Sequence, residues 1–154
     1  MAITRDKVKE EDKWDLSLMY KNDDLWLSDY KKVETDIIKL KKFKGKLTNT
    51  DKILNCLKLI YGIARLVDKV CVYSNLKISE DMTLDIWIKR RGDVKNILTL
   101  LSKEKSFFEP ELLLADDKLF KKMLKDKRFE NYKFYLKKLL KKKKYVLRAK
   151  EEKV

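Results

Sequence analysis

The most consequential absence from this 154-residue sequence is histidine, because the chain contains none. Catalytic zinc sites use histidine in most cases, and serine or cysteine triads need an imidazole as their base. Glycine occurs only at positions 45, 62 and 92, which excludes a glycine-rich phosphate loop. Nothing singles out one catalytic pair among the 25 acidic residues. We therefore assign no catalytic, metal-ligating or cofactor-binding residue, and we predict that this chain alone is not an enzyme.

Turn-forming residues and long apolar runs are also scarce. Three glycines and one proline leave few positions for hairpins, which favours an all-α fold. No window approaches the roughly 20 apolar residues that span a bilayer. The charged opening MAITRDKVKEEDKWD lacks the apolar centre of a signal peptide. We therefore expect a soluble, cytoplasmic protein with no membrane partner.

The only two cysteines, Cys56 and Cys71, fall in one predicted helix. Their separation along the helix axis is roughly 22 Å, which is beyond the reach of a disulfide. We expect both to be buried free thiols in a reducing compartment rather than redox sensors.

Charge is distributed unevenly along the chain. Residues 1–30 hold five basic and eight acidic side chains, whereas residues 121–150 hold fourteen basic side chains and only Asp126 and Glu130 as acids. With its aromatic neighbours, this region could bind nucleic acid. The favoured interpretation is a lysine-rich solvated helix face beside a core stripe, because several apolar residues have core spacing. These are Phe129, Tyr132, Leu136, Leu139 and Leu140.

Apolar residues recur with helical spacing along most of the chain. They predict a first helix from residues 22–24 to Gly45, a second from residues 49–51 to about Ile78, and a third from residues 79–81 to about residue 106. Shorter helices are expected after Pro110, after residues 116–117, and over a last segment that includes Phe129. We predict an all-α, up-and-down helical bundle built on a long antiparallel helical hairpin, with shorter C-terminal helices.

The stretch KWDLSLMY precedes the first predicted helix and is unusually apolar for a chain with 42% charged residues. We interpret it as an extended segment that docks on the hairpin through Trp14, Leu16, Leu18 and Tyr20. The side chains of Asp15 and Ser17 are expected to satisfy nearby backbone donors. The three tryptophans, at positions 14, 26 and 87, are expected in the core rather than in a ligand groove.

Six short motifs occur in a characteristic order between about Lys13 and Glu152. They are KWDLSLMY, NDDLWLSDY, FKGKL, VYSNLKISED, SFFEPELL and ENYKFYLKKLL. Together they resemble the N-terminal helical lobe of oligoendopeptidase F, a family of thimet-oligopeptidase-like zinc metallopeptidases. The resemblance implies a helical lobe, built on a long hairpin, that caps the substrate channel. The family's zinc is held by an HExxH helix and a downstream glutamate in a catalytic lobe, and short peptides are cut inside the cavity.

The HExxH motif is absent here, so no catalytic residue carries over from the family. The resemblance divides the chain into a docking segment (1–22), the helical lobe (23–144) and a connection toward a catalytic lobe (145–154). Tyr145 stands where the family often has histidine. The expected function is that of a noncatalytic, channel-capping lobe of a zinc metallopeptidase that cleaves short peptides.

Two other functions stay open, a free-standing helical protein-interaction module and, less favoured, a basic nucleic-acid-binding domain. Expected partners are a catalytic lobe, or a second copy bound through an exposed apolar patch. Peptides are expected as partners if the chain is part of the whole enzyme.

Overall fold

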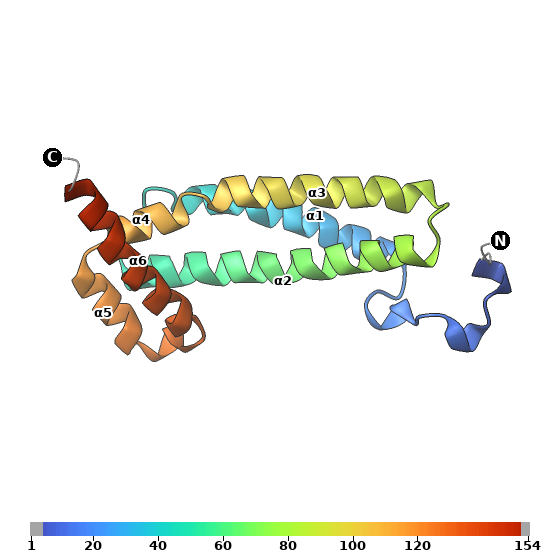
Figure 1. Ribbon diagram of the computed structural model, residues 1–154, viewed down its shortest axis with the longest axis horizontal. Helices are drawn as coiled ribbons and strands as arrows, with labels where there is room; N and C mark the ends of the chain where they lie inside the picture. The colour runs from blue at the N-terminus through green and yellow to red at the C-terminus, as the bar shows by residue number, and fades with distance from the viewer. Residues whose placement is uncertain (1–4, 152–154) are drawn as a thin grey trace. The chain divides into compact units, whose positions relative to one another are not determined.

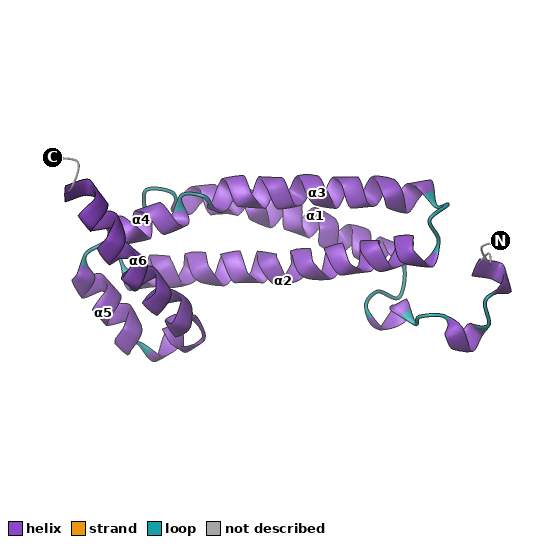
Figure 2. Cartoon of the chain, viewed as in Figure 1, coloured by secondary structure: helices purple, strands orange, loops and turns teal. Residues whose placement is uncertain are grey.

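A computed structural model describes residues 5–151, and within that range every side chain except those of residues 6, 144 and 146–151. Every regular element in this range is a helix (Figure 2). The α-helices are α1 (Asp23–Lys39), α2 (Thr50–Glu80), α3 (Asp85–Lys105), α4 (Phe108–Leu114), α5 (Asp117–Lys125) and α6 (Lys133–Glu151). Short 3-10 helices are η1 (Arg5–Lys7), η2 (Glu10–Asp12), η3 (Leu16–Leu18), η4 (Leu40–Phe43) and η5 (Lys127–Tyr132). The predicted all-α class is confirmed.

The chain divides into two compact units, which we describe separately. Unit 1 comprises residues 1–38 and 61–103, and unit 2 comprises residues 39–60 and 104–154. Within unit 1, α2 and α3 lie side by side and run antiparallel, with α1 beside them (Figure 1). This is the long helical hairpin that the periodicity predicts.

The hairpin turn lies a few residues later than predicted. Ile78 is buried and α2 continues to Glu80, whereas α3 begins only at Asp85. The Asp81 carboxylate accepts hydrogen bonds from the backbone N–H and the hydroxyl of Thr83, at 2.9 and 2.6 Å. Asp81 therefore organises the turn instead of capping α3, because a short polar side chain can hydrogen-bond the backbone two residues on.

An aromatic cluster fills the core of unit 1. Trp26 and Trp87 are 1% and 2% exposed, and their rings meet edge to face with centroids 5.3 Å apart. The indole N–H of Trp26 donates to the Val70 carbonyl at 3.0 Å. The Arg90 guanidinium lies over both indoles, 4.3 Å from the Trp87 centroid and 5.1 Å from that of Trp26, and pairs with Asp23 at 2.9 Å. The core prediction is confirmed for these two tryptophans.

The third tryptophan does not join this core, because Trp14 is 56% exposed. Leu18 is 88% exposed as well, so the predicted docking through four alternating residues is wrong for two of them. The reason is local: residues 16–18 form a 3-10 turn rather than an extended strand. A turn of three residues places Leu16 and Met19 on the side that packs against the core, with Tyr20 buried behind them.

The expected contact with a backbone donor is found for Asp15, whereas the Ser17 hydroxyl donates to the Asp15 carboxylate. The Asp15 carboxylate accepts from the Ser17 N–H at 3.0 Å, as predicted. The Tyr20 hydroxyl donates to Asp29 at 2.9 Å. Burial and this carboxylate both raise the pKa of Tyr20 above its ordinary value. Tyr20 is therefore the anchor of the N-terminal segment.

Unit 2 is built around α4, α5, η5 and α6, with the first turns of α2. Its fully buried side chains include Leu112, Phe120, Met123, Phe129 and Leu136. Two boundaries differ from prediction. The α4 helix begins two residues before Pro110, because proline is tolerated in a first turn, where its missing N–H has no intrahelical partner. The last α-helix begins at Lys133, since residues 127–132 form a 3-10 helix instead.

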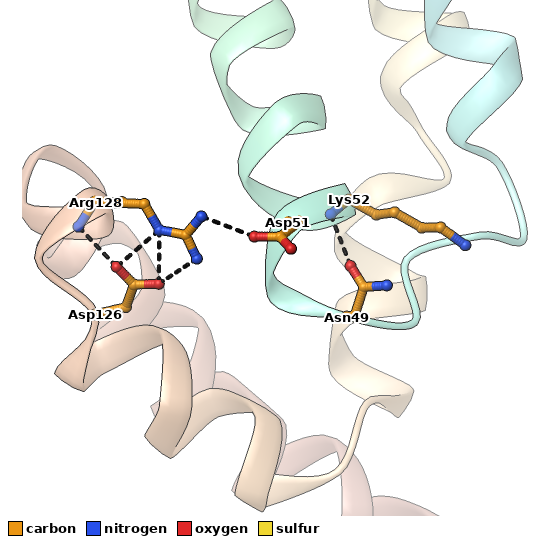
Figure 3. Close-up of polar contacts among 5 residues, drawn as sticks. All are labelled: Asn49, Asp51, Lys52, Asp126 and Arg128. Atoms are coloured by element: carbon orange, nitrogen blue, oxygen red, sulfur yellow. Dashed lines mark hydrogen bonds and ion pairs between the residues drawn. The ribbon is translucent and has the colours of Figure 1, made fainter.

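Polar contacts fix the start of η5 to the start of α2 (Figure 3). Asp126 caps η5 by accepting the Arg128 backbone N–H at 2.9 Å, and its carboxylate also binds the Arg128 guanidinium. The same guanidinium donates to Asp51 in the first turn of α2 at 2.8 Å. The Arg128 hydrogen bonds hold the pKa of Asp126 below its usual value. Asn49 caps α2 by accepting the Lys52 N–H at 2.9 Å.

Candidate functional site

The described side chains do not fit a catalytic zinc ion. The sequence has no histidine, and the side chains that the structure describes include no group of three or more cysteine, aspartate or glutamate residues placed to hold a metal. A zinc site needs at least three such ligands around one point. We therefore derive no step through a metal from these residues.

The two cysteines are free and differ in burial. Cys56 is fully buried, and that burial, with a smaller contribution from Glu111, raises the pKa of its thiol to about 12. A thiol with that pKa carries almost no thiolate at neutral pH and is a poor nucleophile. Cys71 is half-buried, and the Asn75 amide donates to its sulfur at 3.6 Å. The expected burial is complete only for Cys56.

The lysine-rich C-terminal region is largely structural. Phe129, Leu136 and Leu139 are buried in unit 2, as the core interpretation requires. Lys143 is only 7% exposed and donates to the Ala115 carbonyl and to Asp117. Two further α6 lysines, 133 and 142, form ion pairs with acids of the same unit. These contacts favour a solvated basic helix over a dedicated nucleic-acid site.

One face of α6 nevertheless stays open. Phe134 and Tyr145 are 82% and 72% exposed. They are eleven residues apart, which is close to three helical turns, so they lie on the same face as Lys138 and Lys141. The four residues form an exposed aromatic and basic stripe.

A second exposed apolar surface lies at the start of α3 in unit 1. Met82, Leu84, Ile86 and Ile88 are 39–76% exposed, and we call them the α3 apolar segment. Ile86 and Trp87 are neighbours in the first turn of this helix, but only Trp87 enters the core. Apolar residues fill both faces of this first turn, so helical spacing alone does not show which of them are buried.

An open groove of about 350 Å³ lies between α1 and α2 in unit 1. Its lining residues are Lys32, Asp36, Gly62, Arg65, Leu66 and Lys69. Three of these side chains are cationic and one is anionic. The groove was not predicted, although residues 62, 65, 66 and 69 share one helix face by their spacing. Helical spacing alone could not show that α1 adds Lys32 and Asp36 to the same place.

No helix within the described range is long and apolar enough to cross a membrane.

Comparison with known proteins places the chain beside bacterial oligopeptidases. A protein-family profile described as Oligopeptidase F matches residues 111–154. An oligoendopeptidase F homologue from Borreliella burgdorferi is 29% identical over 152 residues, which cover 99% of this chain and 26% of that protein. Group B oligopeptidase PepB from Streptococcus agalactiae is 25% identical, over 99% of this chain and 26% of its own length.

A solved structure shares the fold. The crystal structure of a protein from Chlamydophila abortus, described as a peptidase, superposes with a TM-score of 0.78 at 24% identity. The match covers 90% of this chain and 24% of that one. The chain thus spans about a quarter of the length of the proteins that it matches.

Proposed function

Because the chain resembles the N-terminal helical lobe of oligoendopeptidase F along its whole length, we propose that it is the noncatalytic, channel-capping lobe of an oligoendopeptidase F-like peptidase. The observation that carries the proposal is the match of 99% of this chain to only 26% of its relatives. A chain that corresponds throughout to one quarter of a peptidase is expected to do what that quarter does.

The exposed apolar side chains support this role. Monomeric proteins rarely expose large contiguous apolar patches unless another surface covers them. The α3 apolar segment and the aromatic stripe of α6 are candidates for contact with a catalytic lobe. Fully burying one aliphatic side chain contributes about 1.5–3 kcal/mol, so a few such residues could dominate an interface.

The proposed mechanism of this lobe is steric. Its residues would hold no metal and transfer no proton. They would narrow the entrance to the catalytic cavity, so that short, unfolded peptides enter and folded proteins do not. Zinc-dependent hydrolysis would be carried out by residues outside these 154.

A chimaera tests the proposal. The 152 residues aligned in the Borreliella burgdorferi homologue are replaced by this chain, and cleavage of a quenched nonapeptide and of a folded protein is measured. We expect the chimaera to cut the peptide and spare the protein, and a variant that lacks these residues to lose that discrimination or its activity. A folded chimaera without peptidase activity would overturn the proposal.

The same exposed surface favours a second candidate, a free-standing interaction module. Sedimentation velocity of the isolated chain distinguishes the two. Self-association in the micromolar range that is lost in Ile88→Ser, but kept in a Leu18→Ser control, would favour the module. Both side chains are exposed, at 44% and 88%, so neither substitution is expected to unfold the chain.

A further inference from the structure

The groove between α1 and α2 holds two cationic side chains that have no polar partner among the described residues. Among the described residues, no hydrogen bond or ion pair joins the side chain of Lys32 or Arg65 to another residue. They come from different helices, Lys32 from α1 and Arg65 from α2, and line one open groove of about 350 Å³. Two cationic side chains that face one groove attract an anion placed between them.

The third cation of the groove is already held in position. The Lys69 ammonium lies 3.7 Å from the Asp29 carboxylate and 3.9 Å from the centre of the Tyr20 ring. Counted with Asp29, the groove has three cationic and two anionic side chains, which leaves a formal charge of +1. The net positive charge left for a ligand is small, which suits a singly charged carboxylate better than a doubly charged phosphate.

The uncharged lining residues leave room for a ligand that carries an apolar group. An added Cβ at Gly62 would meet no atom within 4 Å, so the space beside Arg65 is open. Leu66 offers an apolar surface next to the cations. The volume falls at the lower end of the range for small-ligand sites, about 300–1,000 Å³.

We propose that this groove binds the carboxylate of a short peptide, with Arg65 and Lys32 on the carboxylate and Leu66 against the adjoining side chain. A guanidinium can bind both carboxylate oxygens at once, which gives direction as well as attraction. The inference rests on the proposed function, since it gives the capping lobe a contact with its peptide substrates. The carboxylate can come from the peptide C-terminus or from an acidic side chain.

Three probes separate these sources in titrations followed by amide NMR shifts of the whole chain. They are acetyl-Ala-Ala-Leu with a free carboxylate, the same peptide as its C-terminal amide, and an amidated peptide with one internal aspartate. We expect the free acid to shift the amides of residues 62–69, and the amide without aspartate to bind at least tenfold more weakly. Binding of the aspartate peptide would assign the site to acidic side chains as well.

Substitutions give matched comparisons. Arg65→Gln and Lys32→Gln should each weaken binding about five- to tenfold. Gly62→Leu should block the groove without removing a charge, and Gly92→Leu is its control, because Gly92 lies exposed on α3 with equally open space at its Cβ. Equal binding of acid and amide, equal binding by both glycine variants, or tighter binding of inorganic phosphate would overturn the proposal.

The same variants in the chimaera keep the two proposals distinguishable. A chimaera that cleaves peptides with the same KM before and after Gly62→Leu would refute the groove and leave the capping role intact. Carboxylate binding by the isolated chain, together with an inactive chimaera, would refute the capping role and leave the groove.

Discussion

Replacing Trp26 by phenylalanine is expected to lower the free energy of unfolding by about 2–3 kcal/mol. The substitution keeps an aromatic ring in the core but removes the indole N–H that donates to the Val70 carbonyl at 3.0 Å. A hydrogen bond of this kind contributes about 1 kcal/mol. The space left by the second ring adds about 1–2 kcal/mol, less than the roughly 3–5 kcal/mol that removing a whole ring costs.

The matched control is Trp14→Phe, the same chemical change at a side chain that is 56% exposed. Surface substitutions of this kind usually change stability by less than about 0.5 kcal/mol. Urea unfolding followed by circular dichroism at 222 nm measures both variants. Equal destabilisation by the two substitutions would refute the assignment of Trp26 to the core and of Trp14 to the surface.

Three further outcomes are expected. In thermal melts, Tyr20→Ala should lower the free energy of unfolding by about 3 kcal/mol and Leu18→Ala by less than about 0.5 kcal/mol, because only Tyr20 is buried. Similar melting temperatures for the two variants would contradict this. With a disulfide reagent at pH 8, Cys71 should react readily and Cys56 only on unfolding, since only Cys56 is fully buried. Rapid reaction of both thiols in the native chain would refute this prediction. Above pH 9 a cysteine in the unfolded chain ionises, whereas burial raises the pKa of Cys56 in the folded chain to about 12. The unfolded state then binds fewer protons than the folded state, so the free energy of unfolding should fall as the pH rises from 9 toward 12. In urea titrations across that range, Cys56→Ala should show a smaller fall.

Helix content and the hairpin were predictable because they depend on repeated local signals. The apolar spacing of α2, its cap at Asn49 and the absence of internal proline all indicate one long helix, and the structure has it. Trp26 and Trp87 followed from the same spacing. The predicted start of the third helix depended on one kind of residue, the possible caps at residues 79–81. The observed helix starts a few residues later, at Asp85.

The N-terminal segment and the groove show what local patterns cannot give. Tryptophan and leucine are residue types that usually lie in a core, but Trp14 and Leu18 are exposed because a 3-10 turn changes which side chains face the helices. The groove needs residues from two helices, and their relation depends on how the helices pack rather than on either sequence stretch. The resemblance to oligoendopeptidase F came from the order of several weak motifs, which no single motif could supply.

A substitution at Gly62 is expected to change the stability of α2 and the space in the groove in opposite directions. Glycine inside a helix costs about 1 kcal/mol relative to alanine, and at Gly62 an added methyl group meets no neighbouring atom. Gly62→Ala should therefore raise the melting temperature by roughly 2–4 °C. The same methyl group would add bulk to the groove lining beside Arg65. A screen for thermostable variants of this chain would accordingly tend to select a closed groove, and the most stable protein it returned would be the one least able to take a ligand there.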